Sequence, residues 1–177
     1  MIKYNVDVSN PESAVGGSSM FRAGDKVVHP MHGAGVIEGI QEKEVLGETH
    51  QYYIMKLPLG ELKVMIPMDT AEEVGLRQVV DEDGVRKVMD ILKGQTTDMS
   101  SNWNRRYRAN LEKIRSGDIF EVAQVVKNLA ERDKEKGLST GERRMLDSAR
   151  QILVSELVLA RNCTEKEILS ELEEYIG

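Results

Sequence analysis

The hydrophobic period of this 177-residue chain changes near residue 78, and this change restricts the possible folds more than any other feature. Before it, apolar residues come in short runs interrupted by Gly and Pro, which is typical of β-strands. After it, apolar residues recur at intervals of three and four, which is typical of amphipathic helices. A chain whose strands all precede its helices favours two structural units over one alternating layer. We therefore predict an α+β protein with two domains, residues 20–77 and 78–177.

Four short runs rich in Val, Ile, Tyr and Met predict strands in the first half. They are Lys26–His29, Gly35–Gln41, Gln51–Leu57 and Glu61–Ile66. Gly60 separates the last two runs at hairpin spacing, and Gly33 and Gly35 lie where a small sheet would need a sharp bend. Four or five strands in fewer than sixty residues predict a small, strongly bent β-barrel of the SH3-like type.

Five helices are predicted in the second half, which we expect to be an all-α domain. The stripe of the first repeats at i, i+3, i+4 and i+7 from Val85, and the second carries Trp103 and Tyr107 one turn apart. Capping residues and glycines mark the helix ends, namely Gly94, Gly117, Asp118, Gly137, Ser139 with Glu142, and Thr164 with Glu167. The last two pairs have the spacing of a capping box and open the fourth and fifth helices. The fourth is long and apolar over residues 152–160, so we expect it to be the central helix.

Residues 1–19 differ from the rest of the chain in composition. They end in Gly16-Gly17-Ser18-Ser19, the composition of a flexible linker, and Met20 follows like a second start. We expect this segment to be a tag or a disordered extension outside the fold.

The remaining composition disfavours several classes of protein. The single cysteine, Cys163, excludes an internal disulfide. No apolar run approaches the roughly 18 residues of a membrane span, and the N-terminus does not resemble a secretory signal. We expect a cytoplasmic protein that contacts no membrane.

An enzyme is not predicted either. The chain has no glycine-rich phosphate loop and no evident group of nucleophile, base and orienting residue. His29 and His32, with His50 elsewhere in the sequence, leave a metal hydrolase as an alternative, but zinc sites generally need three or four converging ligands. We expect no catalytic residue, no metal and no cofactor.

One basic segment contrasts with the acidic chain, whose net charge is −6. Residues 101–115 contain five Lys or Arg and one Glu, and they include Trp103, Arg105, Arg106 and Arg108. Guanidinium groups suit phosphate binding, and an aromatic residue at a helix start can reach bases or a groove. The alternative is that Trp103 belongs to the helical core, as most large aromatic residues do. Because affinity for DNA grows with the number of phosphates neutralised, we expect weak DNA binding without a partner.

Several long motifs occur in one order along residues 20–177. They are FRAGDKVVHPMHGAGVI at Phe21–Ile37, VMIP at Val64–Pro67, VGLR at Val74–Arg77, NWNRRYRANLEKI at Asn102–Ile114 and LSTGERRMLDSARQIL at Leu138–Leu153. With them the chain resembles the CarD family of bacterial transcription regulators, of the CdnL type. This resemblance implies a Tudor-like N-terminal domain that binds the β subunit of RNA polymerase. It also implies a helical domain that contacts promoter DNA, without sequence readout, at the upstream edge of the melted bubble. Such proteins are not enzymes and stabilise the open promoter complex.

The resemblance also assigns roles to single residues. Trp103 matches the tryptophan that wedges into the minor groove, and Arg105 and Arg108 match basic positions near the DNA backbone. Arg106 lies in the same basic segment and is included with them as a DNA-binding residue. Arg143 matches a basic position on the facing helix.

On the polymerase side, Lys43 and Met65 fall where some family members carry arginines. Lys43 keeps the charge without the planar fork of arginine, and Met65 keeps neither, which predicts a more apolar interface. The second hypothesis is an adaptor that docks a protein through its SH3-like domain and has no role at DNA. In that case Trp103 would belong to the core and the arginines to a solvated face.

Overall fold

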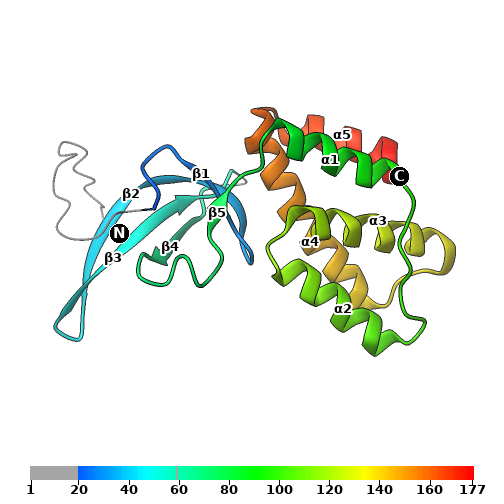
Figure 1. The fold of residues 1–177 in the computed structure, drawn as a ribbon, viewed down its shortest axis with the longest axis horizontal. Helices are drawn as coiled ribbons and strands as arrows, with labels where there is room; N and C mark the ends of the chain where they lie inside the picture. The colour runs from blue at the N-terminus through cyan, green and yellow to red at the C-terminus, as the bar shows by residue number, and fades with distance from the viewer. Residues whose placement is uncertain (1–19, 59) are drawn as a thin grey trace.

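The computed structural model describes residues 20–58 and 60–177, so the expectation for residues 1–19 lies outside the described part. Five strands come first and five helices follow (Figure 1). The strands are β1 (Lys26–His29), β2 (Gly33–Val45), β3 (Glu48–Lys56), β4 (Lys63–Pro67) and β5 (Arg77–Gln78). The helices are α1 (Glu82–Lys93), α2 (Trp103–Arg115), α3 (Ile119–Lys136), α4 (Thr140–Arg161) and α5 (Glu165–Ile176). The predicted two-domain α+β fold class is confirmed.

The strands form one antiparallel sheet in the order β4-β3-β2-β1-β5. Its buried face carries its own apolar core, made of Phe21, Val27, Ile37, Tyr53, Met55, Ile66, Ala71 and Leu76. Because side chains alternate along a strand, the neighbours Tyr52 and Ile54 of β3 lie on the opposite face from Tyr53. Both side chains on that outer face are partly exposed to solvent.

The β2–β3 hairpin is longer than the sequence predicted. Val45 pairs with Glu48 across a two-residue turn at Leu46 and Gly47, whose φ angles are 53° and 82°. Positive φ at both turn residues matches the twist of a tight antiparallel hairpin. The pairing therefore continues through charged, exposed residues, where an apolar run gives no signal. The two-residue strand β5 was not predicted either, because it contains no apolar residue.

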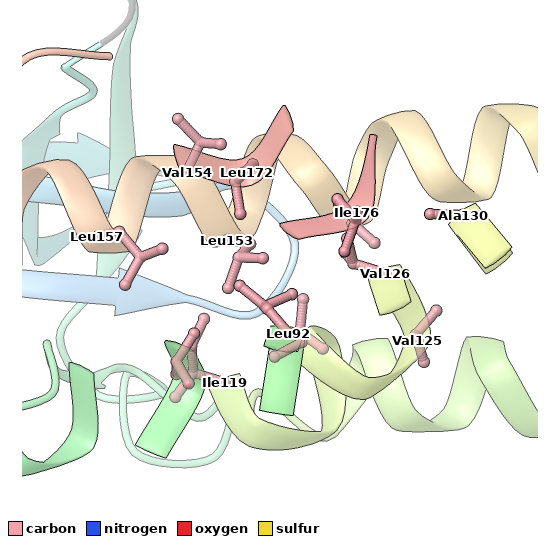
Figure 2. Packing of buried hydrophobic residues seen from close by; sticks show 14 of the residues in the cluster. Leu92, Ile119, Val125, Val126, Ala130, Leu153, Val154, Leu157, Leu172 and Ile176 are labelled. Atoms are coloured by element: carbon pink, nitrogen blue, oxygen red, sulfur yellow. The ribbon is translucent and has the colours of Figure 1, made fainter. Parts of the chain in front are cut away.

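The helical half has a second, separate apolar core. Side chains from α1, α3, α4 and α5 converge there, among them Leu92, Ile119, Leu153 and Ile176 (Figure 2). Both predicted capping boxes are present, at Ser139 with Glu142 and at Thr164 with Glu167. Asp81, Asn102 and Asp118 cap the other three helices. In the part of the chain that the structure describes, no helix is long and apolar enough to cross a membrane.

The sheet packs against the C-terminal half of α4. The Ala34 amide donates a hydrogen bond of 2.9 Å to the Ser155 hydroxyl, and the Lys26 ammonium donates one of 2.8 Å to the Leu159 carbonyl. Gly33 has φ 81°, and a Cβ there would lie 2.5 Å from Ser155 Oγ. Gly33 thus allows close approach of the two halves, which is a stronger requirement than the bend predicted from the sequence.

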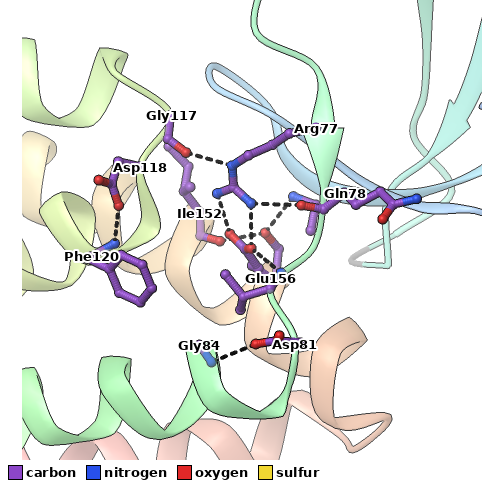
Figure 3. Close-up of polar contacts among 12 residues, drawn as sticks. Arg77, Gln78, Asp81, Gly84, Gly117, Asp118, Phe120, Ile152 and Glu156 are labelled. Atoms are coloured by element: carbon purple, nitrogen blue, oxygen red, sulfur yellow. Dashed lines mark hydrogen bonds and ion pairs between the residues drawn. The ribbon is translucent and has the colours of Figure 1, made fainter. Parts of the chain in front are cut away.

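An ion pair between the partly exposed Arg77 and the buried Glu156 joins the connecting segment to the same helix. Both terminal nitrogens of Arg77 donate to the Glu156 carboxylate at 2.7 and 2.9 Å (Figure 3). Arg77 Nε also donates to the Gly117 carbonyl at 2.8 Å, and the Val80 amide donates to Glu156 at 3.0 Å. The Glu156 side chain is fully buried, so these donors provide its hydrogen bonds. These contacts fix the segment between the sheet and the helices. Independent folding of residues 20–77 and 78–177 stays a prediction.

We predict that Glu156→Ala destabilises the protein by about 3 kcal/mol, because it leaves Arg77 and the Val80 amide without their partner. It should also speed proteolytic cleavage between residues 74 and 81. The matched control is Glu38→Ala, which breaks the exposed Glu38–Lys63 pair and should cost less than about 1 kcal/mol. Urea unfolding and limited trypsin digestion measure the two effects. Equal losses in the two variants would contradict a special role for Glu156.

Candidate nucleic-acid interface

Trp103 is the first residue of α2 and lies at the surface. Asn102 caps the helix by accepting the Arg105 amide, so the indole side chain projects from the helix start. Trp103 is 42% exposed, which contradicts the alternative of a core tryptophan. One of its faces stacks on the Tyr107 ring, with centroids 5.0 Å apart and planes inclined by 24°. The pair is a partly exposed aromatic surface beside the basic segment.

The polar edge of the same indole contacts the start of α4. Trp103 Nε1 donates a hydrogen bond of 3.0 Å to Ser139 Oγ, the N-cap residue of that helix. A Cβ built on Gly141 would lie 3.5 Å from Tyr107 Cε2 and 3.7 Å from Trp103 Cζ2, so both rings rest against the first turn of α4. The sequence marked Ser139 as a cap but gave no sign that it meets Trp103.

Arg106 was assigned to DNA from its place in the basic segment, and this assignment is wrong for the folded chain. Its side chain is only 3% exposed, and its Nε donates to Glu142 Oε1 at 2.6 Å. Its Nη1 also donates to the carbonyls of Ser100 and Ser101. Arg106 therefore has a structural role, because its Nε and Nη1 donors are used inside the protein.

The other predicted arginines remain at the surface. Arg105 and Arg108 are exposed and form no ion pair among the described residues. Arg143 is also exposed, but its guanidinium makes a two-pronged contact with Asp133 at 3.0 and 3.1 Å. With Arg106 paired to Glu142 and Lys113 paired to Glu121, the local positive charge is smaller than the sequence count of +4 suggests.

Lys43 and Met65 lie on the sheet, in the other half of the molecule. Met65 in β4 is 39% exposed and pairs with Ile54 in β3, whereas Lys43 in β2 pairs with His50. The strand alternation puts both on the outer face of the sheet. Ile54 and His50 are four residues apart on β3, or about 13 Å at the usual rise per residue. The two positions therefore share a broad face and are not direct neighbours.

The histidines do not form a metal site in the part of the chain that the structure covers. No group of three His, Cys, Asp or Glu residues there is placed to hold a metal ion. The rings of His29 and His32 are 4.6 Å apart, and His29 Nδ1 accepts the Met31 amide within the turn. Burial, followed by repulsion from His32, lowers the pKa of His29. The geometry is that of a turn after a strand.

Comparisons with known proteins agree with this architecture. Residues 21–80 match the family described as "CarD-like/TRCF RID domain", and residues 87–173 match the family described as "CarD, C-terminal domain". The chain is 42% identical over 151 residues to the "Putative transcription factor YdeB" of Bacillus subtilis (strain 168), covering 85% of this chain and 99% of that protein. The chain belongs to the CarD family.

This membership places the chain among CarD-like transcription factors, a family of regulators and not of known enzymes. The chain is also similar to a solved structure described as "CdnLNt from Myxoccoccus xanthus". That match has 33% identity and a TM-score of 0.32, and it covers 39% of this chain and 97% of the other.

The Arg106–Glu142 pair makes stability depend on pH. Burial raises the pKa of the Glu142 carboxyl, but hydrogen bonds from Arg106 and from the Ser139 backbone and hydroxyl outweigh it, so the pKa lies below its usual range. A carboxyl with a lowered pKa in the folded state stabilises that state above the unfolded pKa of about 4.3. Its contribution is lost as the pH falls through the folded value.

We predict that Glu142→Gln lowers the free energy of unfolding by about 3 kcal/mol at pH 7. The difference from the native sequence should shrink as the pH falls below about 4.3, where native Glu142 begins to lose its own contribution. Urea unfolding at a series of pH values measures this. Glu121→Gln, which removes the exposed partner of Lys113, is the control and should cost less than about 1 kcal/mol. A Glu142→Gln deficit that stays constant down to pH 3 would exclude the pKa argument.

Proposed function

We propose that this protein is a non-enzymatic transcription regulator that binds the β subunit of RNA polymerase through its sheet. In this proposal the helical domain contacts promoter DNA at the upstream edge of the melted bubble and stabilises the open complex. Trp103 is the wedge, and Arg105, Arg108 and Arg143 contact the DNA backbone.

The exposure of Trp103 is the observation that carries this proposal. A half-exposed indole at a helix start is costly to leave in water, since apolar surface favours burial. Aromatic side chains inserted at base steps stabilise unstacked and bent DNA over closed duplex. Exposed Arg105 and Arg108 belong to the same helix and supply the cations that phosphates attract. An adaptor without a role at DNA would leave this aromatic surface unused, so we favour the DNA role.

The geometry of the indole also suits contact without sequence readout. One ring face is covered by Tyr107, and the single N–H donor is already bonded to Ser139. The open face is apolar, and stacking on it tolerates any base. Groove shape and ease of unstacking would therefore decide where the protein acts.

The acidic character of the chain requires a second attachment point. The exposed Arg105 and Arg108 are too few to hold DNA tightly on a protein of net charge −6, because affinity grows with the number of phosphates neutralised. Binding of the sheet to polymerase would bring the helical domain to DNA at high effective concentration. The outer face with Met65, Ile54 and Lys43 is our candidate for that attachment, because it combines half-exposed apolar side chains with the cationic Lys43.

The contacts between the two halves support such joint action. The Arg77–Glu156 pair and the Ala34–Ser155 hydrogen bond fix α4 against the sheet. A rigid connection lets polymerase binding place the indole without further loss of conformational freedom. The protein would then shift the equilibrium toward the open complex because it binds that state better.

We predict that Trp103→Ala shortens the lifetime of the open promoter complex by about five- to 150-fold, the effect of losing one stacked aromatic. Binding to polymerase should be unchanged, because the sheet surface lies in the other domain. Met65→Asp should give the opposite result, weak polymerase binding with a normal melting temperature, as expected for an exposed position. A Trp103→Ala protein that melts normally and still prolongs the open complex would remove the wedge from the proposal.

We predict that Arg105→Ala and Arg108→Ala weaken DNA contact by the polymerase-bound protein and each reduce the salt dependence by about one unit of log–log slope. Arg143→Ala should have a smaller effect, because Asp133 already neutralises much of its charge. The control is Arg86→Ala on α1, which removes the same formal charge from another helix. An equal change in all four variants would mean that net charge, and not these contacts, sets the salt dependence.

A further inference from the structure

The exposed indole of Trp103 is held by a chain of hydrogen bonds that begins and ends at the start of α2. Arg106 Nη1 donates to the Ser100 and Ser101 carbonyls, just before the helix, and its Nε donates to Glu142 Oε1. Glu142 Oε2 accepts the Ser139 hydroxyl at 3.1 Å, and Ser139 Oγ accepts Trp103 Nε1 at 3.0 Å. These hydrogen bonds link both the segment before Trp103 and the indole itself to the start of α4.

The Ser139 hydroxyl is the point where this chain meets the exposed ring. Its oxygen accepts hydrogen bonds from the indole N–H and from the Glu142 amide, and its O–H donates a hydrogen bond to the Glu142 carboxylate. A hydroxyl has one donor and two acceptor positions. All three are therefore used, and the hydroxyl cannot rotate without breaking one of these bonds.

We propose that Ser139, oriented by the buried Arg106–Glu142 pair, is a positioning residue that fixes the orientation of the Trp103 indole for contact with DNA. Tyr107 covers one ring face, Ser139 occupies the N–H edge and Cζ2 lies beside Gly141, so the opposite ring face is presented. This inference rests on the proposed function, in which that open surface meets the bubble edge. It goes further in assigning the roles of Ser139, Glu142 and Arg106.

A pre-oriented ring loses less freedom on binding than a ring that rotates about χ1 and χ2. Immobilising a side chain at an interface costs free energy, and preorganisation removes part of that cost. A neutral hydrogen bond contributes a modest net free energy, equivalent to about a two- to ten-fold change in an equilibrium. Loss of the Ser139 acceptor should therefore weaken the action of Trp103 by this factor and no more.

The test compares substitutions at Ser139 that separate the helix cap from the indole contact. Gly caps helices almost as well as Ser but has no acceptor, whereas Thr and Asp retain both. Trp103 is the only tryptophan in the chain, so its fluorescence anisotropy and acrylamide quenching report on this ring alone. Ser139→Gly should lower the anisotropy and raise the quenching in a protein that still folds, with the melting temperature lowered only by the loss of the hydroxyl's bond to Glu142. It should also shorten the open-complex lifetime about two- to ten-fold. Ser139→Thr should restore all of these values.

A double-mutant cycle identifies the partner of the hydroxyl. Phe has no N–H, so Ser139→Gly should have no further effect on the open-complex lifetime in a Trp103→Phe background. An equal effect in both backgrounds would show that Ser139 acts only as a helix cap and would overturn the inference. Unchanged fluorescence in Ser139→Gly would overturn it as well.

Two outcomes distinguish the wedge role of Trp103 from the positioning role of Ser139. If Trp103→Ala shortens the open-complex lifetime while Ser139→Gly does not, the wedge stands and the positioning role is wrong. If Trp103→Ala has no effect on the lifetime, the proposed function is wrong and the positioning role falls with it.

Discussion

The buried carboxylate of Glu156 is the point on which the arrangement of the two halves depends. A charge removed from water must find donors, or it destabilises the fold by several kcal/mol. Here the donors are Arg77 and the Val80 amide, both from the segment that connects the sheet to the helices. Helix α4 belongs to the helical core, yet its buried glutamate is satisfied only when the end of the sheet is in place. The fold of one half and the position of the other are therefore coupled.

The same helix carries a second buried glutamate near its other end. Glu142 pairs with Arg106 of α2, as Glu156 pairs with Arg77 of β5. The two glutamates are separated by about 21 Å along the helix at the usual rise per residue. One fixes the sheet and the other fixes the helix that carries Trp103, so α4 is a rigid spacer between the two surfaces that we assign to polymerase and DNA. These two pairings explain why the central helix has glutamates at buried positions.

The sequence predicted those elements whose signals are local. The helical stripe from Val85 and the two capping boxes depend on residues within one or two turns, and their spacing alone determines the geometry. The far end of the β2–β3 hairpin was missed because its pairing passes through polar residues without an apolar pattern. The burial of Arg106 was not predicted, for a different reason. Its partner Glu142 is distant in sequence, and composition cannot distinguish an arginine facing solvent from one paired inside. Trp103 was left open between core and surface, since its exposure depends on how α4 packs beside α2.

Gly33 adds a geometrical consequence to the contact between sheet and helix. A Cβ at this position would lie 2.5 Å from Ser155 Oγ and 3.4 Å from Ile152 Cα. The strand can approach α4 this closely only because one side chain is missing, in a turn where φ is positive. Any larger residue at position 33 would press the sheet away from the helix and tilt the two halves, although neither outer surface would change. The angle between the sheet and the helical half is therefore set by a residue that lies outside both surfaces that we assign to polymerase and DNA.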